Sequence, residues 1–269
     1  KKYMMTDAVR NEVQEAVLPF ESISLLELDS HKLLDRFDTK FVLHTDDLNK
    51  LITKLQDDYS SLEIADERVF QYKTLYYDTD DNMLYNLHHN GKLNRSKVRV
   101  REYSSTSIKY FEVKFKSNKH KVYKTRLAGS QIDSELNNDT INQILKKYNL
   151  HDKDLKSKLT VTYNRMTFLH KVLPVKITVD WDLYFKNCIN ERELSELVIV
   201  EFKTARPSDA TEFTLLMKEL QIQELRVSKY CLGVMLLDSQ IKRNRFKQKL
   251  MFINKMLGER NGSAEYFRV

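Results

Sequence analysis

The stretch SKVRVREY, residues 96–103, alternates basic and apolar side chains from Lys97 to Arg101. Successive side chains of a β-strand point to opposite faces, so Lys97, Arg99 and Arg101 share one face and the valines between them share the other. The stretch therefore predicts a strand with one cationic face. The question it raises is whether this face meets solvent or an anionic ligand.

The same alternation recurs along the chain and predicts a series of strands. They are expected at 36–44, 70–78, 96–103, 108–117, 121–129, 158–170, 174–185 and 193–204. The charged or polar positions that share a face on the other strands are Arg36, Asp38 and Lys40, then Glu112, Lys114 and Lys116, then Lys124 and Arg126, then Lys176, Thr178 and Asp180, and finally Glu201 and Lys203. Solvent-facing strand positions usually mix Thr, Ser, Gln and Glu with Lys, whereas several of these faces are mainly basic.

Helices are expected between and beside these strands. Residues 1–34 are helical or irregular in pattern, and further helices are predicted from Thr45 through Tyr59, near 80–90, within 131–156, from 207 to about 221, over 226–237 with its start at Ser228, and over the basic stretch 241–257. The apolar stripe of Leu48, Leu51, Ile52 and Leu55 needs an apolar sheet surface to cover. If helices cover the apolar side of the sheet, the charged side must face inward.

Many strands with few long helices favour an α+β class, in which helices pack outside an antiparallel sheet or barrel. No internal repeat or Pro/Gly-rich linker divides the 269 residues, so one domain over 1–269 is predicted, with its core at about 25–240. A barrel interior lined by lysine and arginine is electrostatically strained when it is empty. Two cations about 6 Å apart repel by roughly 3 kcal/mol at an effective dielectric constant near 20. Water, acidic partners such as Glu112, Asp180 and Glu201, or a bound polyanion must offset that repulsion.

Composition narrows the function further. Forty-five lysines and arginines against 38 acidic residues give a net charge of +7, which favours anionic partners. Only five glycines are present and neither GxxxxGK[ST] nor GxGxxG occurs, so phosphates would have to be held by side chains. Cys188 and Cys231 form no disulfide framework or zinc motif, and the longest apolar run near the end, at 231–237, is too short to cross a bilayer. A cytoplasmic location is therefore expected.

A set of short motifs, in this order, resembles one known family. They are RFDTKF at 36–41, KVRVRE at 97–102, FEVKFK at 111–116, YNR at 163–165, VKITVDWDL at 175–183, VIVEFK at 198–203 and SKY at 228–230. The succession resembles the VTC domain, the polyphosphate polymerase domain of the vacuolar transporter chaperone family, which belongs to the triphosphate tunnel metalloenzymes. The resemblance covers roughly residues 25–240. The related CYTH branch opens with an ExExK motif, which 36–40 does not match, so that branch is disfavoured.

The resemblance implies a fold, a reaction and a set of site residues. The fold is an antiparallel eight-stranded barrel with a basic lumen, and the reaction moves the γ-phosphate of ATP, or another nucleoside triphosphate, onto polyphosphate with Mn²⁺ or Mg²⁺. The implied catalytic residues are Lys40, Arg99, Arg101, Lys114 and Lys229. The implied substrate-binding residues are Lys124, Arg126, Arg165, Lys203 and Ser228, and the implied metal ligand is Glu201. Each suits its role, because arginine and lysine bind phosphate oxygens and a carboxylate binds a hard cation.

Several alternatives stay open at this stage. A hydrolase of triphosphate or short polyphosphate would use the same tunnel, and a non-catalytic polyphosphate or inositol-phosphate binding module would need no metal carboxylate. A nucleic-acid binder is disfavoured, because Trp181 and the many tyrosines are expected to pack the outer core. His88 and His89 are expected on a helix surface, and Asp180 and Asp182 are a candidate second metal pair or salt-bridge partners. A membrane-protein partner, the activator and the oligomeric state stay undetermined.

Overall fold

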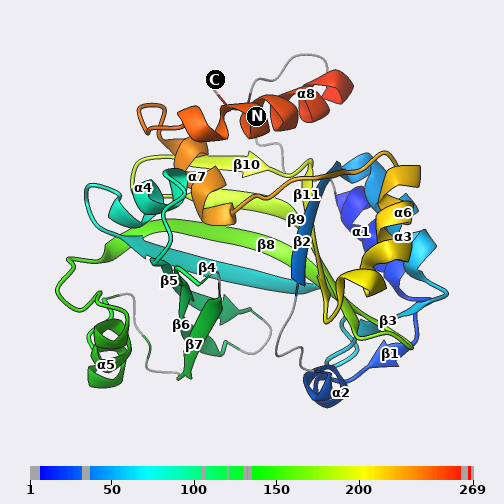
Figure 1. Ribbon diagram of the computed structural model, residues 1–269. Helices are drawn as coiled ribbons and strands as arrows, with labels where there is room; N and C mark the ends of the chain where they lie inside the picture. The colour runs from blue at the N-terminus through cyan, green and yellow to red at the C-terminus, as the bar shows by residue number, and fades with distance from the viewer. Residues whose placement is uncertain are drawn as a thin grey trace.

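A single twelve-stranded sheet organises the computed structural model (Figure 1). The structure describes residues 7–31, 37–104, 107–119, 121–129, 132, 135–261 and 266–267. The strands are β1 (Ser22–Ile23), β2 (Phe37–His44), β3 (Tyr59–Leu62), β4 (Phe70–Asp78), β5 (Arg95–Tyr103), β6 (Lys109–Lys116), β7 (Val122–Ala128), β8 (Lys156–His170), β9 (Val175–Lys186), β10 (Glu191–Leu194), β11 (Leu197–Thr204) and β12 (Gln223–Glu224). The α-helices are α1 (Asp7–Val17), α2 (Leu25–Ser30), α3 (Leu48–Leu55), α4 (Met83–His89), α5 (Asp139–Lys147), α6 (Thr211–Glu219), α7 (Lys229–Leu237) and α8 (Lys247–Asn261), with 3₁₀ turns at Thr45–Asp47, Pro207–Ala210 and Asn244–Phe246.

The main path of the sheet is antiparallel throughout. Its order is β12-β2-β11-β9-β8-β4-β5-β6-β7, while β10 extends β9 and β3 pairs with β8 and, in parallel, with β1. Eight long strands, from β2 to β7 along this path, match the predicted strands closely. The predicted α+β class with a large antiparallel sheet is confirmed, although Arg36, the first residue of the strand predicted at 36–44, lies outside the described residues.

The predicted closed barrel is not observed, because the described sheet has two edges. Among the described strands, β7 pairs only with β6, and β2 carries the short strand β12 on its free side. Gln223 and Glu224 of β12 pair with Val42 and Phe41, so they occupy the edge to which β7 would have to bind. The described strands therefore do not form a closed ring. The predicted closed barrel is replaced by an open, curled sheet.

The curl is deep enough to bring distant strands to one place. The Lys40 ammonium, on β2, donates to the carbonyl of Val227 at 3.2 Å, and the Lys97 ammonium, on β5, contacts the Ser228 hydroxyl at 2.9 Å. Four strands separate β2 from β5, which in a flat sheet would hold them about 24 Å apart. Both lysines reach the start of α7, so the face that carries them is the concave one.

Helices cover the opposite, convex face with the apolar residues that the alternation predicts. Helices α1, α3 and α6 lie together on one side of the sheet in Figure 1 and pack on β2, β8, β9 and β11. Leu48, Leu51, Ile52 and Leu55 of α3 are all buried there. Helix α5 covers Val98 and its neighbours on β5 and β6. The predicted outward apolar face is thus confirmed, and the charged face points inward.

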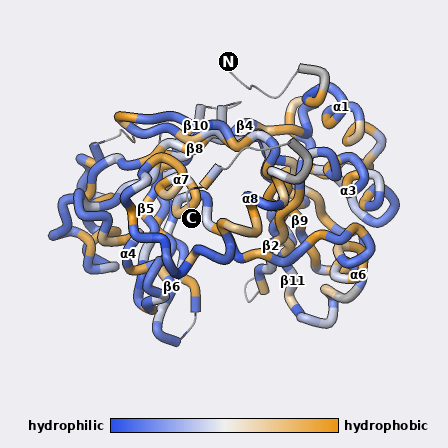
Figure 2. The backbone as a smooth tube through the Cα atoms, turned by 90° about the horizontal axis from the view of Figure 1, so that it is seen from above, coloured by the Kyte–Doolittle hydropathy of each residue, from blue (hydrophilic) through white to orange (hydrophobic). Residues whose placement is uncertain are grey.

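Helix α7 is the exception, because it packs on the concave face. Its residues bury against Leu159 and Phe185 of β8 and β9, and the apolar α7 tube lies near the middle of the view in Figure 2. Helix α8 packs over the same cluster through Leu250, Ile253 and Leu257. This helix begins at Lys247 rather than at 241 as predicted. None of the helices in the described part of the chain has the length and hydrophobicity needed to span a bilayer.

Three predicted elements differ in extent from the observed ones. The helix expected through Tyr59 ends at Leu55, and Tyr59 instead begins β3, which pairs with β8. Within 131–156 the described helix is confined to α5, capped by Asn138. The strand predicted at 193–204 divides into β10 and β11, which both pair with β9. In each case a long-range pairing or a local cap outweighs the hydrophobic pattern.

Candidate anion-binding site

The concave face carries a dense set of charged side chains, which we call the charged face. Its members are Asp38, Lys40, Lys97, Arg99, Arg101, Glu112, Lys114, Lys124, Arg126, Arg165, Asp180, Glu201, Lys203 and Lys229. Cations outnumber carboxylates in this set. All nine of the lysines and arginines that the resemblance singled out share this surface with Lys97, and Ser228 lies at its edge.

Glu112 on β6 is the carboxylate around which the β5 and β7 cations gather. It is 1% exposed and lies 2.7 Å from the Arg99 Nε, 2.7 Å from the Lys124 ammonium and 3.5 Å from the Arg126 Nε. Burial by itself opposes ionisation, but the surrounding cations hold the pKa of Glu112 well below its usual range. Glu112 is thus an anion built into the protein that holds three cations in place.

Asp180 on β9 is a second carboxylate that holds cations of the charged face in place. Arg165 donates to its two oxygens at 2.5 and 2.7 Å, and the Lys229 ammonium donates to it as well. Despite burial, these charges hold the pKa of Asp180 well below its usual range. Because Asp182 has a positive φ of 55° in a bulge of β9, its carboxylate instead binds Arg10 of α1. Asp180 and Asp182 therefore do not form the paired site considered above.

Glu201 lies on β11, between these two groups. The Lys203 ammonium contacts its carboxylate at 2.9 Å, and Lys40 and Lys114 also act on it electrostatically. Although burial opposes ionisation, these lysines hold the pKa of Glu201 well below its usual range. Glu201 is therefore an ionised carboxylate that acts electrostatically on Lys114 of β6, a strand five places away in the sheet.

Arg101 differs from the other arginines of the charged face because it acts on Glu112 electrostatically but forms no direct ion pair with a carboxylate in the described part of the chain. It is 7% exposed, its Nε has no hydrogen-bond partner, and no ion pair to it is found in the described part of the chain. Its guanidinium lies 5.5 Å from the centre of the Tyr72 ring. An unpaired buried charge is costly, so this guanidinium marks a place where an anion would be stabilised.

Tyrosines on the charged face correct an expectation from the sequence. Tyr72 and Tyr163 stack at 5.5 Å, and the Arg165 guanidinium lies over both rings. Farther along, Arg126 stacks 3.5 Å from the Tyr110 ring centre. Tyrosine suits this face because its ring attracts cations, whereas Trp181 does pack on the convex side as predicted.

The start of α7 brings a hydroxyl and a lysine to the same face. Ser228 is the N-cap of α7, and its hydroxyl accepts from the amide of Cys231. The expected helix start at Ser228 is confirmed. Lys229 follows directly and is bound to Asp180, so the helix start faces the charges that the sheet supplies.

A buried aspartate that the sequence did not single out holds α7 in this position. Asp78, at the end of β4, accepts from the amides of Leu84 and Tyr85 in α4 at 2.7 and 2.9 Å and from the Tyr230 hydroxyl at 2.5 Å. Asp78 thus joins α4 to the first turn of α7, next to Lys229. An aspartate between a strand and a helix is a common capping signal, but its bond to Tyr230 spans 152 residues and has no local signature.

The Gly233→Ala variant tests how closely α7 must approach the sheet. A Cβ at this position would lie 2.5 Å from side-chain atoms of both Leu159 and Phe185. We expect a loss of about 1–3 kcal/mol in the free energy of unfolding, as for other overpacked cores. We also expect weaker tripolyphosphate binding, because the helix start would shift. Urea unfolding and calorimetry measure the two effects, and an unchanged affinity would contradict a role for α7 in the site.

The histidines and the cysteines form no metal centre in the described part of the chain, where no group of three or more His, Cys, Asp or Glu side chains converges. The His88 Nδ1 lies 3.2 Å from the Cys231 sulfur, whereas His89 accepts from the Arg245 amide. His89 is 2% exposed and His88 is partly buried, so neither histidine lies on a fully exposed helix surface, contrary to expectation. Cys188 is exposed and Cys231 is buried, and both are free thiols.

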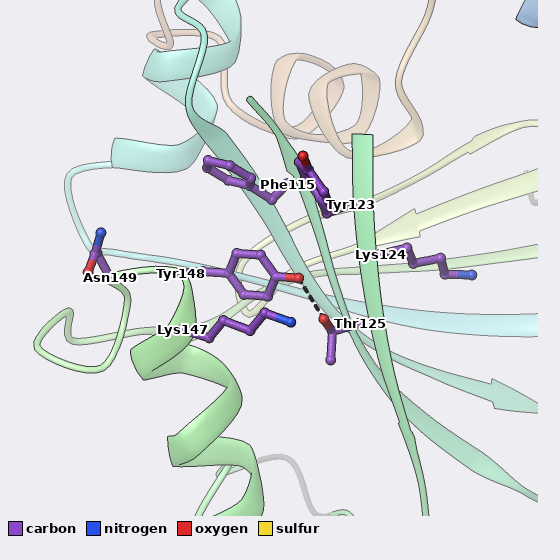
Figure 3. A pocket seen from close by; sticks show the side chains of 7 residues that line it. All are labelled: Phe115, Tyr123, Lys124, Thr125, Lys147, Tyr148 and Asn149. Carbon is purple, nitrogen blue, oxygen red and sulfur yellow. Dashed lines mark hydrogen bonds between the residues drawn. The ribbon is translucent and has the colours of Figure 1, made fainter. Parts of the chain in front are cut away.

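A separate pocket of about 340 Å³ lies on the other side of β7. Figure 3 shows Phe115, Tyr123 and Tyr148 turned toward it, while Lys124 extends away from them. Lys124 points to Glu112 because its strand alternates, with Tyr123 and Thr125 on the outer face. The aromatic pocket and the charged face are therefore on opposite sides of one edge strand.

A curled antiparallel sheet whose concave face carries a cluster of cations defines the structural class of this chain. A model of the VTC domain matches residues 35–238, and the chain belongs to this family, as its motifs indicated. Comparison with curated proteins finds no significant match.

Two solved structures of more distant proteins are similar to this chain to different degrees. A crystal structure from Bacillus halodurans, described as a "putative adenylate cyclase", has 17% identity and a TM-score of 0.51 over 72% of this chain and 94% of that one. A "putative adenylyl cyclase" from Hippeastrum, described as having a dominant triphosphatase activity, has 11% identity and a TM-score of 0.46 over 74% of this chain and 95% of that one. The first likeness concerns the fold alone.

Proposed function

We propose that the protein binds the triphosphate of a nucleoside triphosphate on its charged face and transfers the γ-phosphate to a polyphosphate chain. The observation that carries the proposal is Arg101, a buried guanidinium that forms no direct ion pair among the described residues and whose Nε has no hydrogen-bond partner. A phosphate oxygen would give it the partner that the protein itself does not supply. Membership of the VTC domain family agrees with this ligand class.

The proposed roles follow from where each cation lies. Lys40, Arg99, Arg101, Lys114 and Lys229 would neutralise the transferring phosphates, and Lys124, Arg126, Arg165, Lys203 and Ser228 would hold the rest of the chain. Phosphoryl transfer needs positioning and charge neutralisation more than covalent chemistry from the protein. Glu112 and Asp180 would keep the cations extended and in register before the phosphates arrive. Polyphosphate suits this surface, because a negative charge repeats along the polymer at each phosphate.

The residues fit a divalent cation that arrives with the phosphates rather than one held by a preformed centre. Glu201 offers one ionised carboxylate, and the described residues bring no cluster of three ligands together. Mg²⁺ and Mn²⁺ commonly bind through one or two carboxylates plus substrate phosphates. Glu201 would hold such an ion, which would neutralise charge on the phosphate oxygens. The lysine at 203 would then be released from its present pairing and could bind phosphate.

The experiment that tests the proposal incubates the chain with ATP and Mn²⁺ and measures polymer and free phosphate together. We expect polyphosphate from the parent chain and little or none from the Glu201→Ala and Lys229→Ala variants. Lys50→Ala is a matched control, because Lys50 is an exposed lysine on the outer helix α3. Free phosphate without polymer would identify a hydrolase instead. Tight polyphosphate binding with neither product would identify a binding module.

A further inference from the structure

Ser228 has a second partner that its role as a helix cap does not explain. Its hydroxyl accepts from the Cys231 amide, as an N-cap should, and it also lies 2.9 Å from the Lys97 amine. Lys97 comes from β5, 131 residues away in sequence. A serine hydroxyl in hydrogen-bond contact with a half-buried lysine is an arrangement that other enzymes use to activate a nucleophile.

The surroundings of this pair favour an incoming phosphate. Lys40 binds the Val227 carbonyl and Lys97 binds Ser228, so lysines from two strands reach two consecutive residues, and Lys229 of α7 comes next in the chain. Ser228 and Lys97 are only partly buried, and both lie at the border of the charged face. A phosphate held there would have a hydroxyl oxygen directly beside it.

The protonation state of Lys97 agrees with a role as a base. Burial lowers the pKa of Lys97 to about 7, and the groups that act on it are Cys231, Lys40, Lys114, Arg95 and His88. A large fraction of the Lys97 amine is therefore neutral near pH 7. In the structure the Lys97 amine donates to the Ser228 oxygen, and after losing a proton it can instead accept from the serine O–H while the serine oxygen still accepts from the Cys231 amide.

We propose that Ser228 is a phosphoryl acceptor and Lys97 its general base, so that the protein phosphorylates its own serine from the triphosphate it binds. The Ser228 oxygen forms a bond to the γ-phosphorus, and the bond from that phosphorus to the β,γ-bridging oxygen breaks. The serine proton passes to the Lys97 amine, and a nucleoside diphosphate leaves. The product is a phosphate ester, a poor phosphoryl donor, so it would persist and could serve as the first acceptor for chain growth.

This proposal rests on triphosphate binding at the charged face, but it does not require polymer formation. The test is to incubate the full chain with ATP and Mn²⁺, stop the reaction in acid, and determine intact mass, phosphorylated peptide and polymer from the same sample. We expect at least one phosphoryl group, located on Ser228. Polymer formed by a chain with no phosphoserine would overturn this proposal and leave the polymerase intact. Phosphoserine without polymer would support this proposal and overturn the proposed polymerase activity.

Two substitutions at Ser228 separate the acceptor from the cap. Ser228→Asn keeps a good N-cap but has no hydroxyl, so it should fold and gain no phosphate at this position. Ser228→Thr keeps both cap and hydroxyl and should be phosphorylated at the same position. Equal phosphate incorporation in Ser228→Asn would show that another residue is modified and would refute the assignment.

Lys97→Met tests the base, because methionine has a similar volume and no amine. We expect self-phosphorylation to slow by about 10²- to 10⁴-fold, the usual range for loss of a general base. The parent rate should rise with pH through about 7, as the Lys97 amine loses its proton, and Lys97→Met should lose that rise. A variant with an unaltered pH profile would show that Lys97 only packs against the helix start. Absence of both ATP binding and mass change in the parent chain would overturn this inference and the proposed function together.

Discussion

Replacing Glu112 by glutamine is expected to lower the free energy of unfolding by about 3–5 kcal/mol. The substitution keeps the shape of the side chain but removes the one charge that Arg99, Lys124 and Arg126 share. Three cations would then repel one another around a site that is 1% exposed. Urea unfolding at neutral pH measures the loss. Glu219→Gln is the control, because Glu219 pairs with Lys54 at an exposed position and should cost about 0–1 kcal/mol.

Ligand and pH give this prediction two further checks. Added tripolyphosphate should restore much of the stability of Glu112→Gln, since its oxygens can take the place of the lost carboxylate. In the parent chain the pKa of Glu112 is depressed, so its contribution is present above the pKa of an unfolded glutamate and is lost as the pH falls below it. A Glu112→Gln variant as stable as the parent chain would mean that the cations are not held by this carboxylate.

Replacing Arg101 by methionine should have the opposite effect on stability. Without ligand, we expect the free energy of unfolding to rise by about 1–3 kcal/mol, the usual cost of a buried polar group left unpaired. The same variant should bind tripolyphosphate about 10- to 150-fold more weakly, because a charge-assisted hydrogen bond contributes about 1.5–3 kcal/mol. Thermal unfolding and calorimetry measure the two quantities.

Arg165→Met is the matched comparison on the same face. Arg165 is largely buried, with a side chain 14% exposed, and it donates to both oxygens of Asp180. Its loss leaves that carboxylate with fewer partners and should destabilise the protein by about 3–5 kcal/mol. Both variants should weaken ligand binding, and only the sign of the stability change should differ. If Arg101→Met were destabilised to the same degree, Arg101 would not be the unpaired cation on which the proposed function depends.

Much of the fold could be predicted because its signals are local. Alternation placed β4 at its observed bounds and β5 to within one residue, and Ser228 announced the start of α7. The apolar stripe of α3 correctly implied that helices cover one face and charges the other. The order of the motifs identified the family. The roles of the individual site residues, and the single domain over 1–269, remain predictions.

Where prediction failed, the deciding contact was distant in sequence. Strand β12 takes the edge of β2 that a closed barrel would need, and two residues with no strand pattern of their own cannot announce that. The bulge at Asp182 turns its carboxylate away from Asp180, although simple alternation places the two together. Tyr72 and Tyr163 lie among the arginines, since a tyrosine suits either face of a half-buried sheet.

The sequence by itself determined which side chains share a face, because the geometry of a strand makes every second residue equivalent whatever the strand pairs with. Only the tertiary structure decided which cation meets which carboxylate and which is left alone. Glu112 forms a direct ion pair with Arg99 across one strand pair, while Arg101, two residues along the same strand and identical in pattern, forms no direct ion pair in the described chain. Coulomb attraction depends on distance through space, and that distance is set by the curl of the sheet and not by spacing along the chain.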